Sequence, residues 1–357
     1  MAMDLSALTF NAKEEPDFAK FISERMFEQA ALETMHGPIM SGLTMKQQIV
    51  FASAFGLSGI ADTGCTRPES GAKSTLTQKF WEPKAIGDTF PICQADYNQL
   101  FKAYYDKITS YKERFDITGS DEELFLAAKV SEAASMMIRR LVWFGDTAVA
   151  AANATDAGLK AAGNVKFFSP LDGLWKQIFA EVTANKLQRV TIDENSQVTT
   201  ALQLTLAPGR SIELFESMWA KADDRLKADP TAKFMVSGAI FENYRQWLQS
   251  QSLPFNPTLT MDGMPSLMWN GHEVVNMSSI WGVNLSYFTN NTTDNASWLP
   301  NRILFTAPAN IPIGTLNDGD FNELESWYER KERKNYTAYG MTLDAKFLEG
   351  YMGVAAY

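Results

Sequence analysis

One long amphipathic stretch constrains the fold more than any other part of this chain. The sequence GSDEELFLAAKVSEAASMMIRRLVWFG opens with Ser120 and, three residues later, Glu123, a helix-capping pattern, and it closes with Gly145. A helix over 121–144 is on the order of 36 Å long, so it predicts an elongated or plate-like body. The apolar residues at spacings of three and four that define its buried face are Leu124, Ala127, Val130, Ala134, Met137 and Leu141.

The rest of the chain predicts a mixture of helices and strands, and therefore an α+β fold. Asn270-Gly271 between two β-prone runs is typical of a two-residue hairpin turn. Residues 60–95 are polar, interrupted by Pro and Gly, and favour extended chain. The segment after 320 alternates apolar and charged residues, as in long strands with one exposed face. Helices are predicted over 16–35, 171–186, 211–228 and 239–250, and strands over 187–192, 232–237 and 301–307.

Composition and charge exclude several classes of protein. The chain has 357 residues with 45% hydrophobic and 21% charged residues, which is typical of a folded protein with a substantial core. A net charge of −10 and a pI of about 4.9 oppose tight binding to nucleic-acid phosphates. Cys65 and Cys93 alone make no disulfide framework and fit a reducing interior. The longest apolar stretch is too short and too polar to cross a bilayer, and no secretory signal is visible.

The stretch TGCTRPESGAKST (63–75) contains the residue types of a phosphate-binding loop in the wrong arrangement. Six residues separate Gly64 from Gly71, and Ala72 stands between Gly71 and Lys73. A P-loop needs four residues between its glycines and a lysine directly after the second. The residues that follow favour extended chain instead of the helix whose N-terminus would hold the anion. A long polar loop is the better interpretation.

The sequence offers no pattern for catalysis or metal binding. His36 and His272 are the only histidines, and neither has a metal-ligand neighbour. Gly-x-Ser-x-Gly and His-Glu-x-x-His are both missing from the sequence. An acidic carbohydrate-active enzyme is the alternative from another class, but adjacent acids such as Asp223 and Asp224 point in different directions. We expect no catalytic residue, no metal and no cofactor.

The order of parts and several local motifs resemble one known family. The motifs are LVWFGDT (141–147), PLDGLW (170–175), PTAKFMVSGAIFENYRQWL (230–248), PSLMWNGHEVV (265–275) and PNRILFTAPANIPIGT (300–315). In this order they resemble the major capsid proteins of tailed bacteriophages, which have the Hong Kong ninety-seven type of shell fold. The resemblance covers most of the chain from about 120 onward. Each motif is degenerate, and the specificity lies in their order and spacing.

The resemblance implies four regions. These are an N-terminal arm and lead-in, an extended loop that lies over a neighbouring subunit, a peripheral domain built on the long spine helix, and an α/β axial domain whose tips meet around five-fold and six-fold axes. The implied boundaries are 1–59 for the arm, 60–95 for the loop, 96–168 with 316–357 for the peripheral domain, and 169–315 for the axial domain.

The resemblance also implies candidate subunit contacts. Arg67, Glu69 and Lys73 lie at the base of the extended loop and are expected to pair across the subunit boundary, with Trp81 as a further contact. The run YERKERKNY (328–336) allows three interpretations: a nucleic-acid site, a solvated strand face or a subunit contact. Interleaved glutamates and the acidic chain disfavour the first. The basic candidates in this run are Arg330, Lys331, Arg333 and Lys334.

The function implied is a structural one. Many copies of the chain would form hexamers and pentamers of an icosahedral phage head that encloses double-stranded DNA. The shell would contact this DNA only weakly and without sequence specificity. About 45 residues precede the hairpin segment, so a separate scaffolding protein is expected, together with a portal and decoration proteins. The expected location is the virion, after assembly in the host bacterial cytoplasm and without a membrane. An encapsulin-type nanocompartment is the alternative within the same fold.

Overall fold

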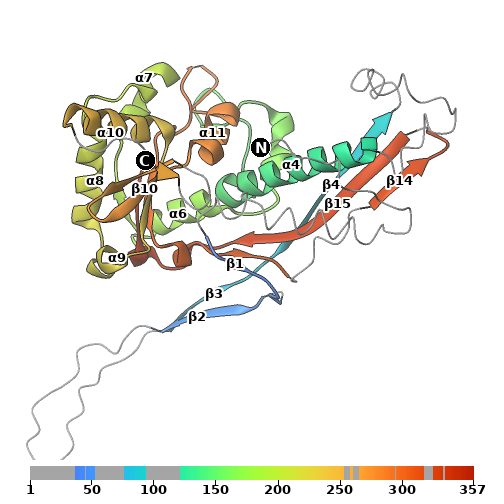
Figure 1. Ribbon diagram of the computed structural model, residues 1–357, viewed down its shortest axis with the longest axis horizontal. Helices are drawn as coiled ribbons and strands as arrows, with labels where there is room; N and C mark the ends of the chain where they lie inside the picture. Colours follow the sequence, from blue (N-terminus) through green and yellow to red (C-terminus); the bar gives the residue numbers. More distant parts are fainter. Residues whose placement is uncertain are drawn as a thin grey trace, which may run out of the picture.

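A computed structural model gives the three-dimensional structure of the chain. It describes residues 37–44, 46–52, 76–93, 121–252, 258–259, 265–293, 295–316, 325–332 and 334–357. A broad lobe of helices around a sheet occupies one side of the molecule, and a long β-ribbon with a parallel helix extends from it (Figure 1). The predicted helix 16–35 and the capping residue Ser120 lie outside the described residues.

The long helix α4 spans Asp121–Phe144, as the sequence predicts. Of its predicted inward residues, Val130, Ala134, Met137 and Leu141 are buried. The helix ends at Gly145, where a Cβ atom would lie 2.6 Å from both Leu141 O and Leu171 O. Glycine is therefore required for the following segment to cross this close to the helix end.

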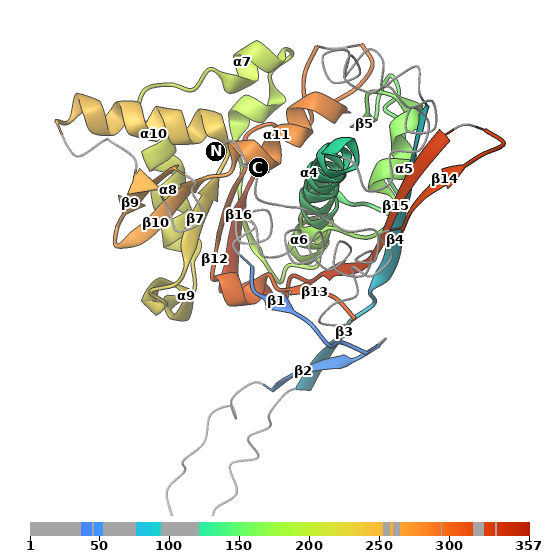
Figure 2. The ribbon, with the colours of Figure 1, turned by 45° about the vertical axis from the view of Figure 1, so that its right-hand side comes forward.

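A mixed seven-stranded sheet forms the centre of the lobe, in the order β6-β16-β12-β7-β10-β9-β8. Side chains alternate between its two faces. Phe234, Val236 and Ile303 belong to the core shared with α8 and α10, whereas Met235 and Leu304 belong to the core shared with α4, α6 and α11. The lobe thus has three layers (Figure 2). The strands are β6 Gln188–Val190, β7 Lys233–Val236, β8 Thr258–Leu259, β9 Pro265–Trp269, β10 His272–Asn276, β12 Ile303–Thr306 and β16 Gly353–Ala356.

Most predicted elements of the lobe are confirmed. Asn270 and Gly271 have φ values of 47° and 83° and join β9 to β10, as the Asn-Gly pair predicts. The predicted helix 211–228 is instead two helices, because Ala222 is extended and the Asp223 side chain caps the second one. The helix α11 was not predicted. The helices are α5 Val165–Phe168, α6 Leu174–Thr183, α7 Thr200–Leu204, α8 Arg210–Lys221, α9 Asp224–Ala228, α10 Gly238–Ser250 and α11 Ser278–Tyr287.

A second sheet forms the ribbon that runs beside α4. Strand β15 pairs antiparallel with β4 and β14 along its length, and at its end with β13, which pairs with β1. Buried and partly exposed residues alternate along β15, which confirms the predicted strand with one exposed face. The buried face contacts α4, where Tyr339 Oη lies 3.6 Å from Met137 Sδ. The strands are β1 Ile39–Met40, β4 Lys84–Cys93, β13 Ile313–Gly314, β14 Glu325–Glu329 and β15 Lys334–Ala345.

Two strand pairings lie close to the predicted domain boundaries, which stay predictions. Strand β2, Gln48–Ala52, in the predicted arm 1–59 pairs with β3, Leu76–Phe80, in the predicted loop 60–95. The strands of the predicted peripheral segment 316–357 belong to two sheets. Strand β15 lies in the ribbon, but β16 pairs with β6 and β12 in the sheet of the lobe, because Val354 and Ala355 fill positions on its two faces. Two short strands, β5 Gly158–Leu159 and β11 Phe288–Thr289, pair separately.

Candidate assembly interface

The hairpin β2–β3 stands away from the lobe (Figure 1), and two of its apolar side chains, Val50 and Phe80, are exposed. Paired residues of antiparallel strands share a face, so Gln48, Val50, Gln78 and Phe80 lie together on one side. Val50 is 54% exposed and Phe80 40% exposed, and the Gln48 and Gln78 amides bond to each other between them. An exposed strand pair with apolar side chains on one side is a candidate surface for pairing with another chain. We call these four residues the outer face of the hairpin.

The opposite face of the hairpin is anchored to the lobe. Lys79 Nζ lies 2.6 Å from Glu181 Oε1 on α6 and donates to the carbonyl oxygen of Phe347 at 2.7 Å. Both side chains are partly shielded from solvent, which limits screening of the pair. The pair therefore fixes which face of the hairpin is turned toward the body.

Trp81 follows β3 directly and is 2% exposed within its own chain. A Cβ atom on Gly314 would lie 2.6 Å from the Trp81 ring, so the ring fits only because that position is glycine. Its backbone NH donates to Gln47 O, and its carbonyl accepts from Lys46 N, both at 2.9 Å. The sequence singled out Trp81 as a subunit-contact candidate, but the structure places its ring inside the chain as the base of the hairpin.

The connection between β3 and β4 is held by a buried carboxylate. Glu82 N donates to Asp344 Oδ2 at 2.7 Å, and Lys346 Nζ lies 3.1 Å from the same oxygen. Burial raises the pKa of Asp344, and the attraction of Lys346 opposes that shift. Trp81, Asp344 and the Lys79–Glu181 pair therefore position the hairpin from three sides.

The basic run of residues 328–336 lies at the tip of the ribbon. Arg330 and Lys331 are exposed, and Lys334 Nζ lies 3.4 Å from Glu332 Oε2. The Tyr336 hydroxyl donates to the same Glu332 carboxylate, and these hydrogen bonds lower the pKa of Glu332. Local glutamates thus compensate part of the basic charge at this tip.

An exposed aromatic pair lies beside the tip, and neither of its residues is among the subunit contacts predicted from the sequence. Trp327 on β14 stacks on Tyr336 of β15 with ring centroids 5.2 Å apart, and Trp327 is 39% exposed. Register places both rings on the solvent face of the ribbon, opposite to the face that contacts α4. The alternation of the terminal strands is the signal that would have identified this pair.

The comparisons with known proteins identify the fold. No family model matches the chain, and no curated protein matches it. Solved structures do match along nearly the whole chain. A chain of the satellite phage P4 procapsid including the size determination (Sid) protein has a TM-score of 0.50 at 13% identity, covering 94% of this chain and 97% of that one. The capsid of the native GTA particle has a TM-score of 0.51 at 10% identity, covering 92% and 90%. Gordonia phage Cozz has a TM-score of 0.52 at 9% identity, covering 92% and 86%.

The chain has the capsid fold. Specifically, it is the Hong Kong ninety-seven type. The predicted subunit-contact residues that the structure describes do not form one site. Trp81 lies at the base of the hairpin and Lys334 near the ribbon tip, and these two parts project from different sides of the body (Figures 1 and 2). The remaining candidates, Arg67, Glu69, Lys73 and Arg333, lie outside the described residues.

The described ranges contain a buried histidine but no cluster of metal ligands. No group of three or more His, Cys, Asp or Glu residues in these ranges is placed to hold a metal ion. His272 is buried with its two ring nitrogens 3.1 Å from Ala232 O and 3.2 Å from Lys227 O, so it takes part in packing of the lobe. None of the helices in the described ranges combines the length and apolarity that a bilayer-spanning segment needs.

Proposed function

We propose that this chain is the major capsid protein of a tailed phage and that it assembles into hexamers and pentamers of an icosahedral head. The observation that carries the proposal is the end-to-end match: capsid chains of the same fold are covered over 86% to 97% of their own length. The chain therefore contains the shell-forming parts of those subunits and not only a shared subdomain.

The geometry of the hairpin supports assembly through many weak contacts. Its outer face exposes Val50 and Phe80, while its inner face is held by Lys79 and Trp81. A preorganised hairpin loses little conformational entropy when a neighbouring subunit covers it. In a closed shell each subunit makes several such contacts, and closure adds them together.

Charge supports a container that holds DNA weakly. The net charge of −10 disfavours tight binding to the phosphate backbone. A wall that repels DNA weakly lets the genome enter and leave, which suits a packaged double-stranded genome. The proposed partners are other copies of the chain, a separate scaffolding protein, a portal and decoration proteins, and the proposed location is the virion. We propose no enzymatic activity.

Electron microscopy of the purified full-length chain, expressed alone and together with its scaffold, tests the proposal. We expect rings, tubes or closed shells, and light scattering masses far above the 39.8 kDa of one chain. A single 39.8 kDa species at high concentration in both preparations would contradict the proposal.

A matched pair of variants tests the role of the hairpin. Val50→Asp places a charge on the outer face and is expected to reduce assembly at least tenfold, since a charge on a covered apolar surface is costly. Val198→Asp is the control, because Val198 is equally exposed but lies on the lobe. Assembly of Val50→Asp at the level of the unmodified chain would exclude the outer face of the hairpin as a contact. Nuclease-protected DNA in the particles supports a phage head, whereas a co-purifying cargo protein supports the encapsulin alternative.

A further inference from the structure

Arg302 is a buried cation with no carboxylate partner within the described ranges. Its side chain is 1% exposed, and neutral acceptors hold it: Nε donates to Leu299 O at 2.8 Å, and Nη2 donates to Asn284 Oδ1 at 3.2 Å. Among the residues that the structure describes, Nη1 has no hydrogen-bond partner. Burial lowers the pKa of the guanidinium to about 9, which indicates a charge that its surroundings stabilise poorly.

Aromatic rings surround this cation and come from different elements. The guanidinium carbon lies 4.8 Å to 5.5 Å from the ring centroids of Phe144, Trp175, Phe179 and Trp298. Phe144 ends α4, Trp175 and Phe179 belong to α6, and Asn284 adds a contact to α11. Cation–π attraction offsets part of the cost of burial. One charged group thus joins the end of α4 to two helices of the lobe.

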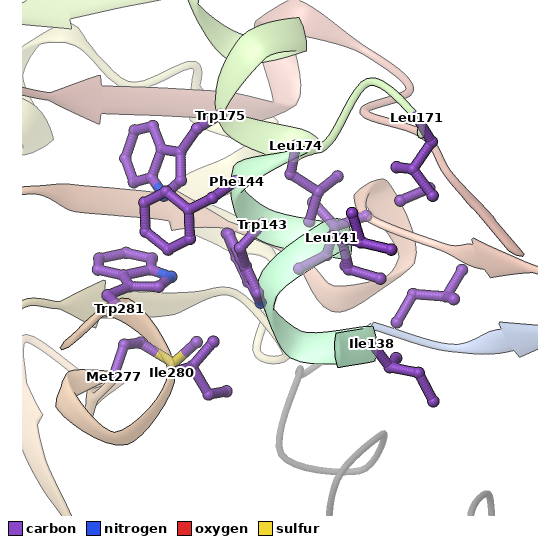
Figure 3. Close-up of a cluster of buried hydrophobic side chains, with 14 of the residues drawn as sticks. Ile138, Leu141, Trp143, Phe144, Leu171, Leu174, Trp175, Met277, Ile280 and Trp281 are labelled. Carbon is purple, nitrogen blue, oxygen red and sulfur yellow. The ribbon is translucent and has the colours of Figure 1, made fainter. Parts of the chain in front are cut away.

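Trp143, Trp175 and Trp281 pack together near the end of α4 (Figure 3), and the Trp175 ring centroid lies 4.8 Å from the Arg302 guanidinium carbon. Trp281 lies 5.3 Å from Trp143 and 5.2 Å from Trp175, measured between ring centroids. The Nε1 atom of each of the three is buried and has no hydrogen-bond partner in the described parts of the chain. A buried indole NH usually finds an acceptor. We call these three residues and Arg302 the Arg302 junction.

We propose that the Arg302 junction is a conformational device that keeps the contact between the end of α4 and the helices α6 and α11 easy to rearrange. An apolar core of the same size would lose only packing on opening. The junction instead gains acceptors for four donors and hydration for one charge when water enters. Opening therefore costs less here than elsewhere in the core. This property belongs to the single chain and does not depend on the proposed shell.

Arg302→Met tests the device by removing the charge while keeping a long side chain. The carbonyl oxygens of Trp298 and Leu299 still accept from Asn284 Nδ2, at 2.6 Å and 3.2 Å, so only Asn284 Oδ1 loses a donor. We expect the urea midpoint of the full-length chain to rise by roughly 0.5–1 M, because replacing an uncompensated buried charge with an apolar group is often stabilising.

Arg210→Met is the matched control. Arg210 contacts Asp193, Glu194 and Glu213 at 2.8 Å to 3.2 Å, so its removal is expected to lower the urea midpoint. A lower midpoint for Arg302→Met as well, or its failure to fold, would overturn the proposal and make Arg302 a stabilising anchor.

Hydrogen exchange measures the opening itself, on the full-length chain in the assembly state in which it purifies. In Arg302→Met we expect the amides of 141–144 and 280–284 to exchange at least about tenfold more slowly, and those of α10 to be unchanged. Arg302→Lys keeps the charge and should show no slowing. Unchanged exchange at the junction in Arg302→Met would overturn the proposal, even if the urea midpoint rises.

Discussion

Lys79 in the hairpin and Glu181 on α6 form an ion pair of 2.6 Å across 102 positions of sequence. The Glu181 side chain is only 14% exposed, and the Lys79 ammonium also binds the Phe347 carbonyl oxygen. This pair links the hairpin β2–β3 to α6, the helix that packs against α4. Contacts with the lobe therefore set the direction of the hairpin.

Replacement of Lys79 by Met is expected to reduce assembly while changing the free energy of unfolding by about 1 kcal/mol or less, since partly exposed ion pairs contribute little to stability. The physical reason is that the pair orients the hairpin without filling the core. Urea denaturation and electron microscopy of the same preparation measure the two effects. Lys129→Met is the control, because Lys129 pairs with Glu132 on one face of α4. Normal assembly of Lys79→Met would contradict the role given to the pair.

Gly173 is expected to be intolerant of even one added methyl group. A Cβ atom there would lie 2.6 Å from Leu141 O and 2.7 Å from Gly145 N, both backbone atoms that cannot rotate away. Its φ of −74° is ordinary, so the close approach is the cause. Gly173→Ala should lower the free energy of unfolding by about 1–3 kcal/mol.

Gly282→Ala is the control for this prediction, because Gly282 lies within α11 and nothing occupies the position of its Cβ within 4 Å. Alanine in an open helix interior should raise the free energy of unfolding by about 0.5–1 kcal/mol. Urea denaturation ranks the free energies of unfolding of the two variants. If Gly173→Ala is the more stable of the two, the backbone around Gly173 moves enough to accept the methyl group.

Asp223 is expected to make the stability of the lobe depend on acid pH. Its Oδ1 accepts from both the side chain and the backbone NH of Arg225 at 2.9 Å, and these bonds lower the pKa of Asp223 to about 2. Because the pKa is lower in the folded chain than the unfolded value of about 3.9, this stabilisation is present above about pH 4 and is lost as the pH falls through about 2.

Asp223→Ala should lower the free energy of unfolding by about 1 kcal/mol at neutral pH through loss of the helix cap. The difference from the unmodified chain should shrink between about pH 4 and pH 2, which urea denaturation at several pH values measures. Asp223→Asn keeps the capping oxygen without the titration. If the difference in the free energy of unfolding between Asp223→Ala and the unmodified chain stays constant with pH, the ionised Asp223 carboxylate does not contribute to it.

Arg330 tests the interpretations of the ribbon tip. It is exposed, so Arg330→Glu should change the free energy of unfolding by less than about 0.5 kcal/mol. If the tip contacts acidic residues of a neighbouring subunit, assembly should fall, and the defect should be smaller at high salt, which screens the new repulsion. Lys186→Glu, an equal charge change at an exposed position of the lobe, is the control. Unaltered assembly would favour a solvated strand face, and lost DNA binding would favour a nucleic-acid site.

Local patterns were sufficient to predict much of the fold. The spacing of apolar residues defined α4, and the backbone preference of Asn270-Gly271 defined the hairpin of the lobe. The break between α8 and α9 was missed because Asp223 reads equally well as a helical residue and as a cap. Helix α11 was missed because it is apolar on several sides, which hides the helical period.

The candidate site could be predicted only in part. The sequence predicts an extended segment and a basic run near the end of the terminal strands, but it gives no sign that the Trp81 ring is buried within its own chain. Burial of that ring depends on Gly314, more than two hundred residues away, and no local pattern reports such a contact. The Lys79–Glu181 pair is equally non-local, since lysine and glutamate are ordinary surface residues until the fold brings them together.

The position of β16 between β6 and β12 has a consequence for biosynthesis. The central sheet of the lobe has a gap until Gly353–Ala356 have left the ribosome, because β6 can join the other strands only through β16. Such a non-local pairing has a large sequence separation, which slows folding of the lobe.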